Sequence, residues 1–524
     1  MEWTGTAIVL LIALRYWLWY FNRTLNLLDE GSTAAQALRV LNGELIYRDF
    51  FTVVTPGSYY TVAWLFQLFG PSLMVLRWSA LVTGIGILLL TLVIARRVMS
   101  WPFAAAAALM TTVWGWFLVT PNFYSLQAAL FALIALWCYL RHVEGAGRHW
   151  IVIAGVMTGL TVLVKQNVGA YAALALLLAI MTSDERVRRS ARFIGGIAIP
   201  VLPTLLFLIA AGAGPYLYES WVYYPLAKYP ERFALPYPRL FEPLAGHGDF
   251  EIWVRAVIFL PFIVYPLAAV AIVRARERHA LAAITLMGVL LLLQSWPRAD
   301  VAHILFGLQP TFIVFAFLLC AASRGRALVA AVMLAPLLLL LWYGYQRTDW
   351  EYSNYVAHVR ADRALGVATL PIDAHRIDLV TRYVRDNTTL DDSIFVVPWA
   401  AGFYFLTDRA NATRSDFMLF EDPEAYPCLL ARLEERRPKY VIYGYTWDVD
   451  NKRFREYAAP IDAYIRSRYA IEDEVDGYEV WRRLDAASTA TNSWAGACRP
   501  KRFRWRDLFG GPAESASSAA RSVQ

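Results

Sequence analysis

Long apolar runs dominate the first two thirds of the chain. A helix needs about 20 mostly apolar residues to cross the roughly 30 Å hydrocarbon core of a bilayer. Runs that approach or exceed this length occur at residues 4–21, 72–95, 101–119, 122–140, 149–165, 168–182, 193–214, 253–273, 280–295, 303–322 and 327–345. Residues 1–345 are therefore predicted to form a polytopic α-helical membrane domain with about eleven transmembrane helices.

Arginines and lysines alternate along the connections between these runs. Cations gather in every second connection, at Arg96 and Arg97, Arg141 and Arg148, residues 186–192, residues 274–278, and Arg324 and Arg326. Cytoplasmic connections of membrane proteins are enriched in Lys and Arg. The pattern therefore predicts a cytoplasmic N-terminus and places residues 22–71, residues 215–252 and everything after about residue 346 on the extracytoplasmic face.

The segment 57–70 is apolar but too short to cross a bilayer. It favours a helix that lies at the outer membrane interface, with Tyr59, Tyr60 and Trp64 at the level of the headgroups. The alternative is that this segment is the beginning of a long tilted span that continues into residues 72–95.

The pattern changes after residue 345, where charged residues become frequent and apolar segments shorten. Helical patterns at residues 375–387, 423–437 and 453–468 alternate with strand patterns at residues 393–397, 439–444 and 477–483. This alternation predicts a small extracytoplasmic α/β domain over residues 346–485. Residues 486–524, with a basic and aromatic stretch at 501–506 and an Ala- and Ser-rich end, are expected to form a disordered tail.

Composition supports a membrane protein and argues against nucleic-acid binding. Of the 524 residues 58% are hydrophobic and 17% are charged, against about 25% charged residues in soluble proteins. The net charge of +7 comes from cations in short connections rather than from one basic face. Cys138 and Cys320 lie in apolar runs, whereas Cys428 and Cys498 lie in the extracytoplasmic part, where a disulfide between them is one hypothesis.

Two adjacent carboxylates, Asp29 and Glu30, follow the first apolar run by only a few residues. Charges so close to hydrocarbon carry a desolvation cost, which favours a functional role. A carboxylate here can act as a general base toward a hydroxyl, or hold a divalent metal ion against a phosphate. The structural alternative is a helix N-terminus, with Asp29 as the cap of a helix over residues 31–42. Both interpretations can hold together.

A second group of candidates is cationic and has the same predicted depth, at the outer edge of the membrane. It consists of Lys165, Arg298 and His303. Such side chains stabilise a phosphate-bearing leaving group where the dielectric is low. The alternatives are snorkelling of Lys165 from the end of a span and a structural pair between Arg298 and Asp300.

The outer loop 215–252 is rich in aromatic residues and also contains Lys228. Aromatic faces pack against sugar rings or polyprenyl chains, and a lysine can reach a phosphate. The alternative is an ordinary aromatic belt at the membrane interface.

The stretch 29–77 resembles the GT-C membrane glycosyltransferases, especially the branch that contains the protein O-mannosyltransferases and the lipid A aminoarabinose transferase. Proteins of this branch carry an Asp-Glu pair after the first span, a helix that ends near a glycine, a Pro-Pro-x-Tyr-Tyr-like stretch, and a Phe-Gly before an arginine that opens the next span. The matching residues here are Asp29 and Glu30, Gly43, Pro56 to Tyr60, Phe69 and Gly70, and Arg77. Two positions depart from the pattern, because Gly57 replaces the second proline and Thr55 stands where a lysine is common.

The resemblance implies an inverting, polyprenyl-phosphate-sugar-dependent glycosyltransferase. The enzyme would move a sugar from the lipid carrier to a lipid, glycan or protein acceptor on the extracytoplasmic face. Asp29 would be the catalytic base with Glu30 in support. The residues expected to bind the phosphate or the substrate are Lys165, Arg298, His303, Tyr59, Tyr60 and Lys228. A divalent metal ion is the one cofactor that the pattern allows. The implied location is a bacterial inner (plasma) membrane.

Two rival classes remain at this stage. A transporter or flippase of lipid-linked sugars would also have many spans and an aromatic outer loop, but such proteins usually show related halves and broken helices near the midplane. A catalytically silent member would use its C-terminal domain to recruit partners. The presence of both Asp29 and Glu30 favours the enzyme over either rival.

Overall fold

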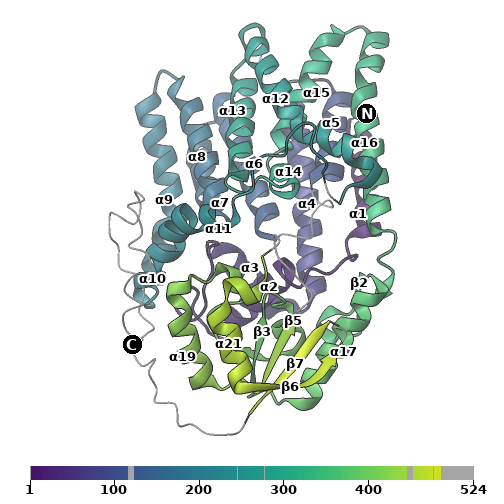
Figure 1. Cartoon of the computed structure of the whole chain (residues 1–524). Coiled ribbons are helices and arrows are strands. Elements are labelled where there is room, and N and C mark those ends of the chain that lie inside the picture. Colours follow the sequence, from purple (N-terminus) through teal and green to yellow (C-terminus); the bar gives the residue numbers. More distant parts are fainter. Residues whose placement is uncertain are drawn as a thin grey trace.

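A bundle of long helices stands on a smaller α/β domain, and the segment after the first helix lies between the two (Figure 1). The computed structural model describes residues 2–115, 123–244, 246–275, 278–444, 452–475 and 477–484. The predicted tail 486–524, Cys498 and the end of the predicted span 101–119 lie outside these residues. Cys428 is disulfide-bonded, whereas Cys138 and Cys320 are free.

Each of the predicted spans coincides with a helix. These helices are α1 (Glu2–Tyr20), α4 (Leu73–Ala95), α5 (Trp101–Gly115), α6 (Phe123–Val143), α7 (His149–Val164), α8 (Gln166–Met181), α9 (Arg186–Ala210), α12 (Glu251–Arg274), α13 (Arg278–Leu292), α15 (Gln309–Ser323) and α16 (Ala327–Tyr352). In the described part of the chain, six are both long and apolar enough to cross a membrane: α4, α6, α9, α12, α13 and α16. The protein is thus a polytopic helical membrane protein.

Two span boundaries differ from the prediction. The span predicted at 303–322 begins as the separate short helix α14 (Val301–Leu305), and α15 starts only at Gln309. At the other end, α16 continues to Tyr352 instead of stopping at residue 345. Its polar last turns contain Arg347, which is buried, so contacts inside the protein extend the helix beyond its apolar run.

The helices pack closely where small residues face one another. A Cβ placed on Gly155 of α7 would lie 2.1 Å from the Phe193 carbonyl oxygen of α9, so these two backbones touch. Small residues at such crossings allow the close approach on which helix association in membranes depends. By contrast, α9 and α16 bury only 17% of their apolar windows, and their Leu, Ile and Val side chains face outward. We infer that these outward faces contact lipid.

Arginine-rich connections gather at the end of the bundle that is remote from the α/β domain. The connections α8–α9, α12–α13 and α15–α16 lie at the top of Figure 1, and the α/β domain lies at the bottom. The arrangement is the one that the alternation of cations predicted, so the assignment of the arginine-rich end to the cytoplasm stays the working prediction.

The first outer segment contains helix α2 (Asp29–Leu41) and helix α3 (Gly57–Phe69). A turn separates α3 from α4, in which Gly70 has a φ of +82° and the Ser72 hydroxyl accepts a hydrogen bond from the Met74 N–H at the start of α4. The segment 57–70 is therefore a separate helix and not the start of a tilted span. Trp64 is 60% exposed and Phe69 is 70% exposed, which agrees with a helix at the membrane interface.

The outer connections after α9 consist of short helices. They are α10 (Gly214–Tyr218), the π-helix η1 (Glu219–Lys228), α11 (Tyr229–Phe233), the 3-10 turns η2 (Gly248–Phe250) and η3 (Leu293–Ser295), and α14. The aromatic outer loop of the sequence is thus largely helical.

The C-terminal domain is a mixed five-stranded sheet with helices, in the strand order β4-β3-β5-β7-β6. The strands are β3 (Ser393–Val397), β4 (Ala410–Asn411), β5 (Tyr440–Gly444), β6 (Tyr469–Val475) and β7 (Tyr478–Arg483), and the main helices are α17 (Pro371–Asn387), α18 (Gly402–Thr407), α19 (Tyr426–Arg436), α20 (Phe454–Tyr457) and α21 (Ala459–Arg468). A two-stranded sheet of β1 (Ala357–His358) and β2 (Ala368–Thr369) precedes them, and single turns η4 (Asp362–Ala364), η5 (Met418–Phe420) and η6 (Pro423–Ala425) lie between them.

Apolar side chains of the first outer segment pack into the core of this domain. Leu27, Ala34 and Leu38 near or in α2 belong to the same buried cluster as Ile377 of α17. Phe66 of α3 stacks on Phe405 of α18 with ring centroids 5.5 Å apart. The first outer segment and the C-terminal domain thus share one hydrophobic core.

The backbones of these two parts approach each other closely at Gly31 in α2. A Cβ at this position would lie 2.5 Å from the Gly402 Cα of α18 and 2.6 Å from its nitrogen. The Gly402 N–H donates a 2.8 Å hydrogen bond to the Leu27 carbonyl next to it. Only a residue without a side chain fits between the two backbones.

We predict that Gly31→Ala lowers the thermal unfolding temperature of the detergent-solubilised protein, because the new methyl group would push the C-terminal domain off α2. Overpacking of this kind costs about 1–3 kcal/mol. Gly195→Ala in α9 is the matched control, since among the described atoms nothing lies within 4 Å of its added Cβ. Equal unfolding temperatures for the two variants would contradict the close packing of α2 on α18.

Candidate active site

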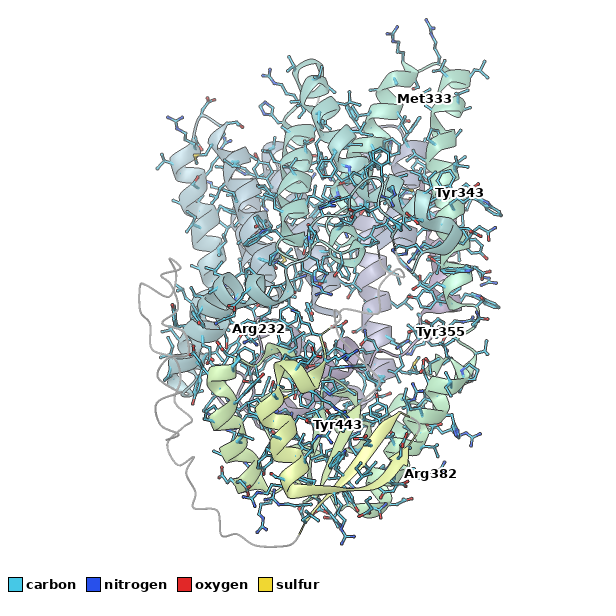
Figure 2. All side chains as sticks on the ribbon, viewed as in Figure 1. Arg232, Met333, Tyr343, Tyr355, Arg382 and Tyr443 are labelled. Atoms are coloured by element: carbon cyan, nitrogen blue, oxygen red, sulfur yellow. The ribbon has the colours of Figure 1, made fainter. Side chains whose placement is uncertain are left out.

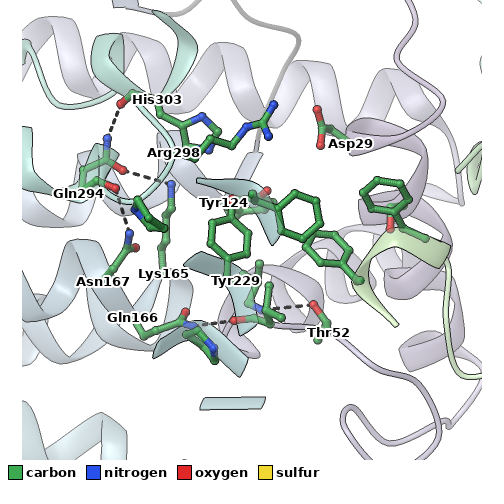
Figure 3. Close-up of a pocket in the computed structure, with 18 of the residues that line it drawn as sticks. Asp29, Thr52, Tyr124, Lys165, Gln166, Asn167, Tyr229, Gln294, Arg298 and His303 are labelled. Atoms are coloured by element: carbon green, nitrogen blue, oxygen red, sulfur yellow. Dashed lines mark hydrogen bonds between the residues drawn. The ribbon is translucent and has the colours of Figure 1, made fainter. Parts of the chain in front are cut away.

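A cavity of about 770 Å³ lies where the ends of the membrane helices, the first outer segment and the C-terminal domain meet. Polar side chains enter it from the first turns of α2, the junction of α7 and α8, the segment from η3 to α14, and the C-terminal domain. Figure 3 shows Asp29 on one wall and Lys165, Arg298 and His303 on the opposite side. The remaining wall is largely aromatic, with Trp221, Tyr229 and Phe420 among its residues.

A buried ion pair fixes the segment that carries Asp29. The Arg77 guanidinium at the start of α4 donates from Nε and Nη2 to the two carboxylate oxygens of Glu30, at 2.8 and 2.6 Å. Arg77 also donates to the carbonyls of Phe21, Arg23 and Thr24. Both side chains are almost fully buried, with exposures of 1% and 0%. The five donors of Arg77 thus tie the end of α1 and the start of α2 to α4.

Asn26 holds the backbone at the start of α2, whose N-cap residue is Leu28, so the carboxylate of Asp29 is not used for capping. The Asn26 Oδ1 accepts hydrogen bonds from the N–H groups of Leu28 and Asp29, both at 2.8 Å. Its amide donates to the Asp29 Oδ2 at 3.1 Å, which orients the carboxylate. The structural alternative in which Asp29 caps the helix is therefore wrong. Asp29 is the first residue of α2 and lines the cavity.

Burial raises the pKa of Asp29 above the ordinary value of an aspartate. The nearby side chains of His303 and Arg298, together with the hydrogen bond from Asn26, act in the opposite direction. Figure 3 shows the Arg298 guanidinium and the Asp29 carboxylate turned toward each other across the cavity. In its ionised form, a carboxylate with a raised pKa is a stronger general base than an ordinary aspartate.

Arg298, Asp300 and His303 form one hydrogen-bonded group. Asp300 accepts from Arg298 Nε at 2.8 Å through Oδ2, and its Oδ1 lies 2.7 Å from His303 Nδ1. Burial opposes the charge of Asp300, but the hydrogen bonds from His303 and the charge of Arg298 lower its pKa to about 2. The pair between Arg298 and Asp300 was the structural alternative, and it is present. Because Arg298 and His303 also line the cavity, the pairing holds them in position toward it.

Lys165 joins α7 to α8 and points into the cavity. Its ammonium donates to the Ser125 hydroxyl at 2.8 Å and lies 3.4 Å from the Gln294 Oε1. Burial lowers the pKa of Lys165 to about 8, and the charge of Asp300 opposes the shift. The ammonium thus lies inside the protein, on neutral hydrogen-bond acceptors, and does not snorkel to the surface. A buried ammonium held by neutral partners gains most from an incoming anion.

The other predicted binding residues are not all in the cavity. Tyr59 lines it and forms a 2.9 Å hydrogen bond with Thr52, but Tyr60 packs against Phe207 outside the lining formed by the described residues. Lys228 of η1 pairs with Asp422 and Glu231, at 3.5 and 3.4 Å, and is also absent from the described lining. Glu30 faces Arg77 instead of the cavity. These residues were predicted because they lie at the same depth, near the outer edge of the membrane. Depth alone does not show whether a side chain points into the cavity or away from it.

Several residues that shape the site carry no motif. Asn26 and Ser125 orient Asp29 and Lys165, and Gln294 contacts both Lys165 and Asn167. A weak signal did exist for Asn26, because Asn side chains accept hydrogen bonds from backbone N–H groups a few residues later.

The side chains that the structure describes do not supply a complete metal site. Among the described residues no group of three or more His, Cys, Asp or Glu side chains is arranged to hold a metal ion. The nearby Asp300 is already engaged by Arg298 and His303. A divalent ion bound at Asp29 would have to take its remaining ligands from the substrate. None of the steps derived below uses a metal.

No family model and no curated protein matches this sequence. Solved structures do match its fold. ArnT from Cupriavidus metallidurans aligns over 92% of this chain and 99% of its own, with a TM-score of 0.60 and 14% identity in the apo state. The same protein bound to undecaprenyl phosphate gives a TM-score of 0.57. The archaeal oligosaccharyltransferase AglB from Archaeoglobus fulgidus, in complex with an inhibitory peptide and a dolichol-phosphate, aligns over 92% of this chain and 74% of its own, with a TM-score of 0.55 and 13% identity.

These neighbours are glycosyltransferases of the GT-C type, and the chain has the GT-C fold. The fold that the motif of residues 29–77 predicted is thereby confirmed. The similarity extends over almost the whole chain, so it includes the C-terminal domain as well as the helices.

We predict that Arg77→Lys destabilises the protein strongly, although it keeps the charge. A lysine cannot reach both oxygens of Glu30 and three carbonyls at once. Breaking a buried pair costs about 3–5 kcal/mol. Thermal unfolding in detergent measures the loss. Arg97→Lys, which affects a pair with the more exposed Glu144, should change the unfolding temperature little. Similar unfolding temperatures for both variants would show that the buried fork of Arg77 is dispensable.

Proposed function

We propose that this protein is an inverting glycosyltransferase that moves a sugar from a polyprenyl phosphate carrier to an acceptor hydroxyl at the extracytoplasmic membrane face. The observation that carries the proposal is the division of charge in the cavity. A carboxylate with a raised pKa, Asp29, faces a wall with Lys165 and Arg298. The fold supports the same reaction class, because GT-C neighbours bind undecaprenyl phosphate and dolichol-phosphate.

In the proposed reaction the acceptor hydroxyl lies against Asp29. Its oxygen attacks the anomeric carbon of the donor sugar while Asp29 accepts the hydroxyl proton. The bond between the anomeric carbon and the phosphate oxygen breaks, and its electron pair stays on the departing polyprenyl phosphate. Lys165 and Arg298, the latter held by Asp300, offset the charge that builds up there. Because one displacement occurs, the anomeric configuration inverts.

Glu30 acts in this proposal as a positioning residue. Its carboxylate is fully engaged with Arg77 and does not line the described cavity. It supports Asp29 by holding the first turn of α2, on which both residues lie. Tyr59 lines the cavity and is proposed to contact substrate, whereas Tyr60 and Lys228 would act only through their neighbours.

The cavity also agrees with the proposed orientation in a bacterial inner membrane. It lies at the end of the bundle next to the C-terminal domain, opposite the arginine-rich connections. The lipid tail of a polyprenyl phosphate can then remain in the bilayer while its phosphate reaches the cavity. The acceptor would enter from the extracytoplasmic side.

We predict that Asp29→Asn lowers sugar transfer by about 100-fold or more, because it removes the general base. Transfer is measured from radiolabelled polyprenyl-phosphate sugars in membranes at matched expression. Binding of undecaprenyl phosphate should stay within about twofold of wild type, since the amide retains the contact with Asn26. In wild type the acid limb of the pH–rate profile should lie above the ordinary aspartate pKa of about 4, because only the ionised carboxylate accepts the proton.

Asp408→Asn, at an exposed position outside the cavity, is the control for the substitution itself. Unchanged transfer by Asp29→Asn would remove Asp29 from the mechanism. If wild-type membranes move label across the bilayer without attaching it to an acceptor, the protein is a transporter of lipid-linked sugars and the proposal falls.

We predict that the affinity for undecaprenyl phosphate falls as the pH rises through about 8, where the unliganded Lys165 loses its proton. The protonated ammonium attracts the phosphate, and the neutral amine does not. Calorimetric titrations at pH 6.5 and 9.5 measure the difference. Lys165→Met should bind more weakly at pH 6.5 and show a much smaller pH effect. A pH dependence that survives this substitution would exclude Lys165 as the phosphate ligand.

A further inference from the structure

The cavity has a second polar end that the transfer chemistry described above does not use. Ser32 and Gln36 of α2 line it from one side, and Ser415 and Asp416 of the C-terminal domain line it from the other. Gln36 is 5% exposed and Asp416 is 4% exposed, so both are deeply buried. The domain that contributes Asp416 is thus part of the cavity wall.

One oxygen of Asp416 is held by the protein and the other is not. Oδ1 accepts a 2.7 Å hydrogen bond from the Asn411 amide and lies 3.6 Å from Arg39 Nη1. Oδ2 is buried and forms no hydrogen bond of ordinary length with a described residue, and the Gln36 side chain lies beside the carboxylate. A carboxylate oxygen left without a partner inside a protein is costly, and a donor from a ligand would remove this cost.

Gln36 presents a second buried acceptor oxygen that lacks a hydrogen-bond partner in the described part of the chain. Its amide nitrogen lies 3.5 Å from the Ser32 hydroxyl, whereas its Oε1 is buried without a partner in the described part of the chain. Two unpaired acceptor oxygens, one from α2 and one from the C-terminal domain, therefore line the same end of the cavity. A ligand that supplies two donors would satisfy both.

Gln36 lies away from Asp29, where the proposed transfer takes place. Asp29, Ser32 and Gln36 follow one face of α2, and Gln36 lies seven residues after Asp29, or about 10 Å along the helix axis. The two sets of residues also belong to different walls, since Lys165 and Arg298 face Asp29 across the cavity, whereas Asp416 comes from the C-terminal domain. Burial raises the pKa of Asp416, whereas Arg39, which also binds Glu44 and two backbone carbonyls, favours its charged form.

We infer that Gln36 and Asp416 form a subsite for the acceptor, which accepts hydrogen bonds from a sugar-like unit next to the one that is glycosylated. The inference rests on the proposed transferase function and extends it. It assigns the acceptor to neutral polyhydroxylated molecules of at least two units. A phosphate-bearing unit at this position would be repelled by Asp416 and would leave Oδ2 and Oε1 unpaired. The aromatic rings of Phe417 and Phe420, which also line the cavity, offer surfaces on which a sugar ring can pack.

The test is calorimetric binding to the protein in lipid nanodiscs. The probes are hexyl glycosides of maltose, lactose and mannobiose, each with and without a phosphate on the terminal sugar. Wild type should bind at least one neutral probe, and its phosphorylated form at least about tenfold more weakly. Asp416→Asn should weaken the neutral probe about tenfold or more and narrow the difference between the two forms. Gln36→Leu should weaken it by a smaller factor, and the control Asp408→Asn should not change it.

Retained binding of undecaprenyl phosphate shows that a variant is folded. If Asp416→Asn no longer binds undecaprenyl phosphate, the comparison of wild type with Gln36→Leu tests the inference instead. The inference is overturned by equal affinities of wild type and the folded subsite variants, by a phosphorylated probe that binds as tightly as its neutral form, or by no binding of any neutral probe to wild type. Binding that depends on Asp416, without sugar transfer to the same probe, would keep the subsite and refute the transferase proposal.

Discussion

The geometry of the site depends on the buried pair of Arg77 and Glu30. A buried ion pair adds little net stability compared with apolar side chains of the same size, because desolvation offsets its attraction. In this protein the main effect of the ion pair is to fix the position of helix α2. Arg77 binds three carbonyls in the chain between α1 and α2 as well as both oxygens of Glu30, so the path of the chain into α2 is determined at several points. Asp29 can then face the cavity without making structural bonds of its own, apart from its contact with Asn26.

Helix α2 connects three parts of the molecule. Its first residue faces the cationic wall, its apolar face packs into the core of the C-terminal domain, and Gly31 touches α18 directly. The C-terminal domain is therefore coupled to the position of Asp29, although the domain is remote in sequence. Removal of that domain would expose Leu27, Ala34 and Leu38 to water and release α2. The membrane helices alone do not contain the whole site.

Long periodic features were predictable from the sequence and side-chain directions were not. Spans and the buried strands β3 and β5 carry strong apolar patterns, and the structure has helices and strands at these positions. Strand β6 was missed because its central residues are all exposed and largely acidic, so it lacks an apolar period. The motif of residues 29–77 identified Asp29 and Arg77, but only packing shows that Glu30 faces away from the cavity and that Lys228 is engaged by Asp422. Asp416 was missed entirely, because one aspartate in a polar segment has no local pattern.

The placement of Asp29 and Gln36 on a single helix has a consequence for specificity. In the proposed reaction Asp29 must keep its relation to the carrier phosphate, whereas the proposed acceptor subsite includes Ser415, Asp416, Phe417 and Phe420 of the C-terminal domain. Changes in that segment alter what the far end of the cavity binds without moving Asp29, because α2 is held separately by Arg77 and Asn26. A rigid helix with the reacting group at one end and the recognition group about two turns away therefore separates the chemistry from the choice of acceptor.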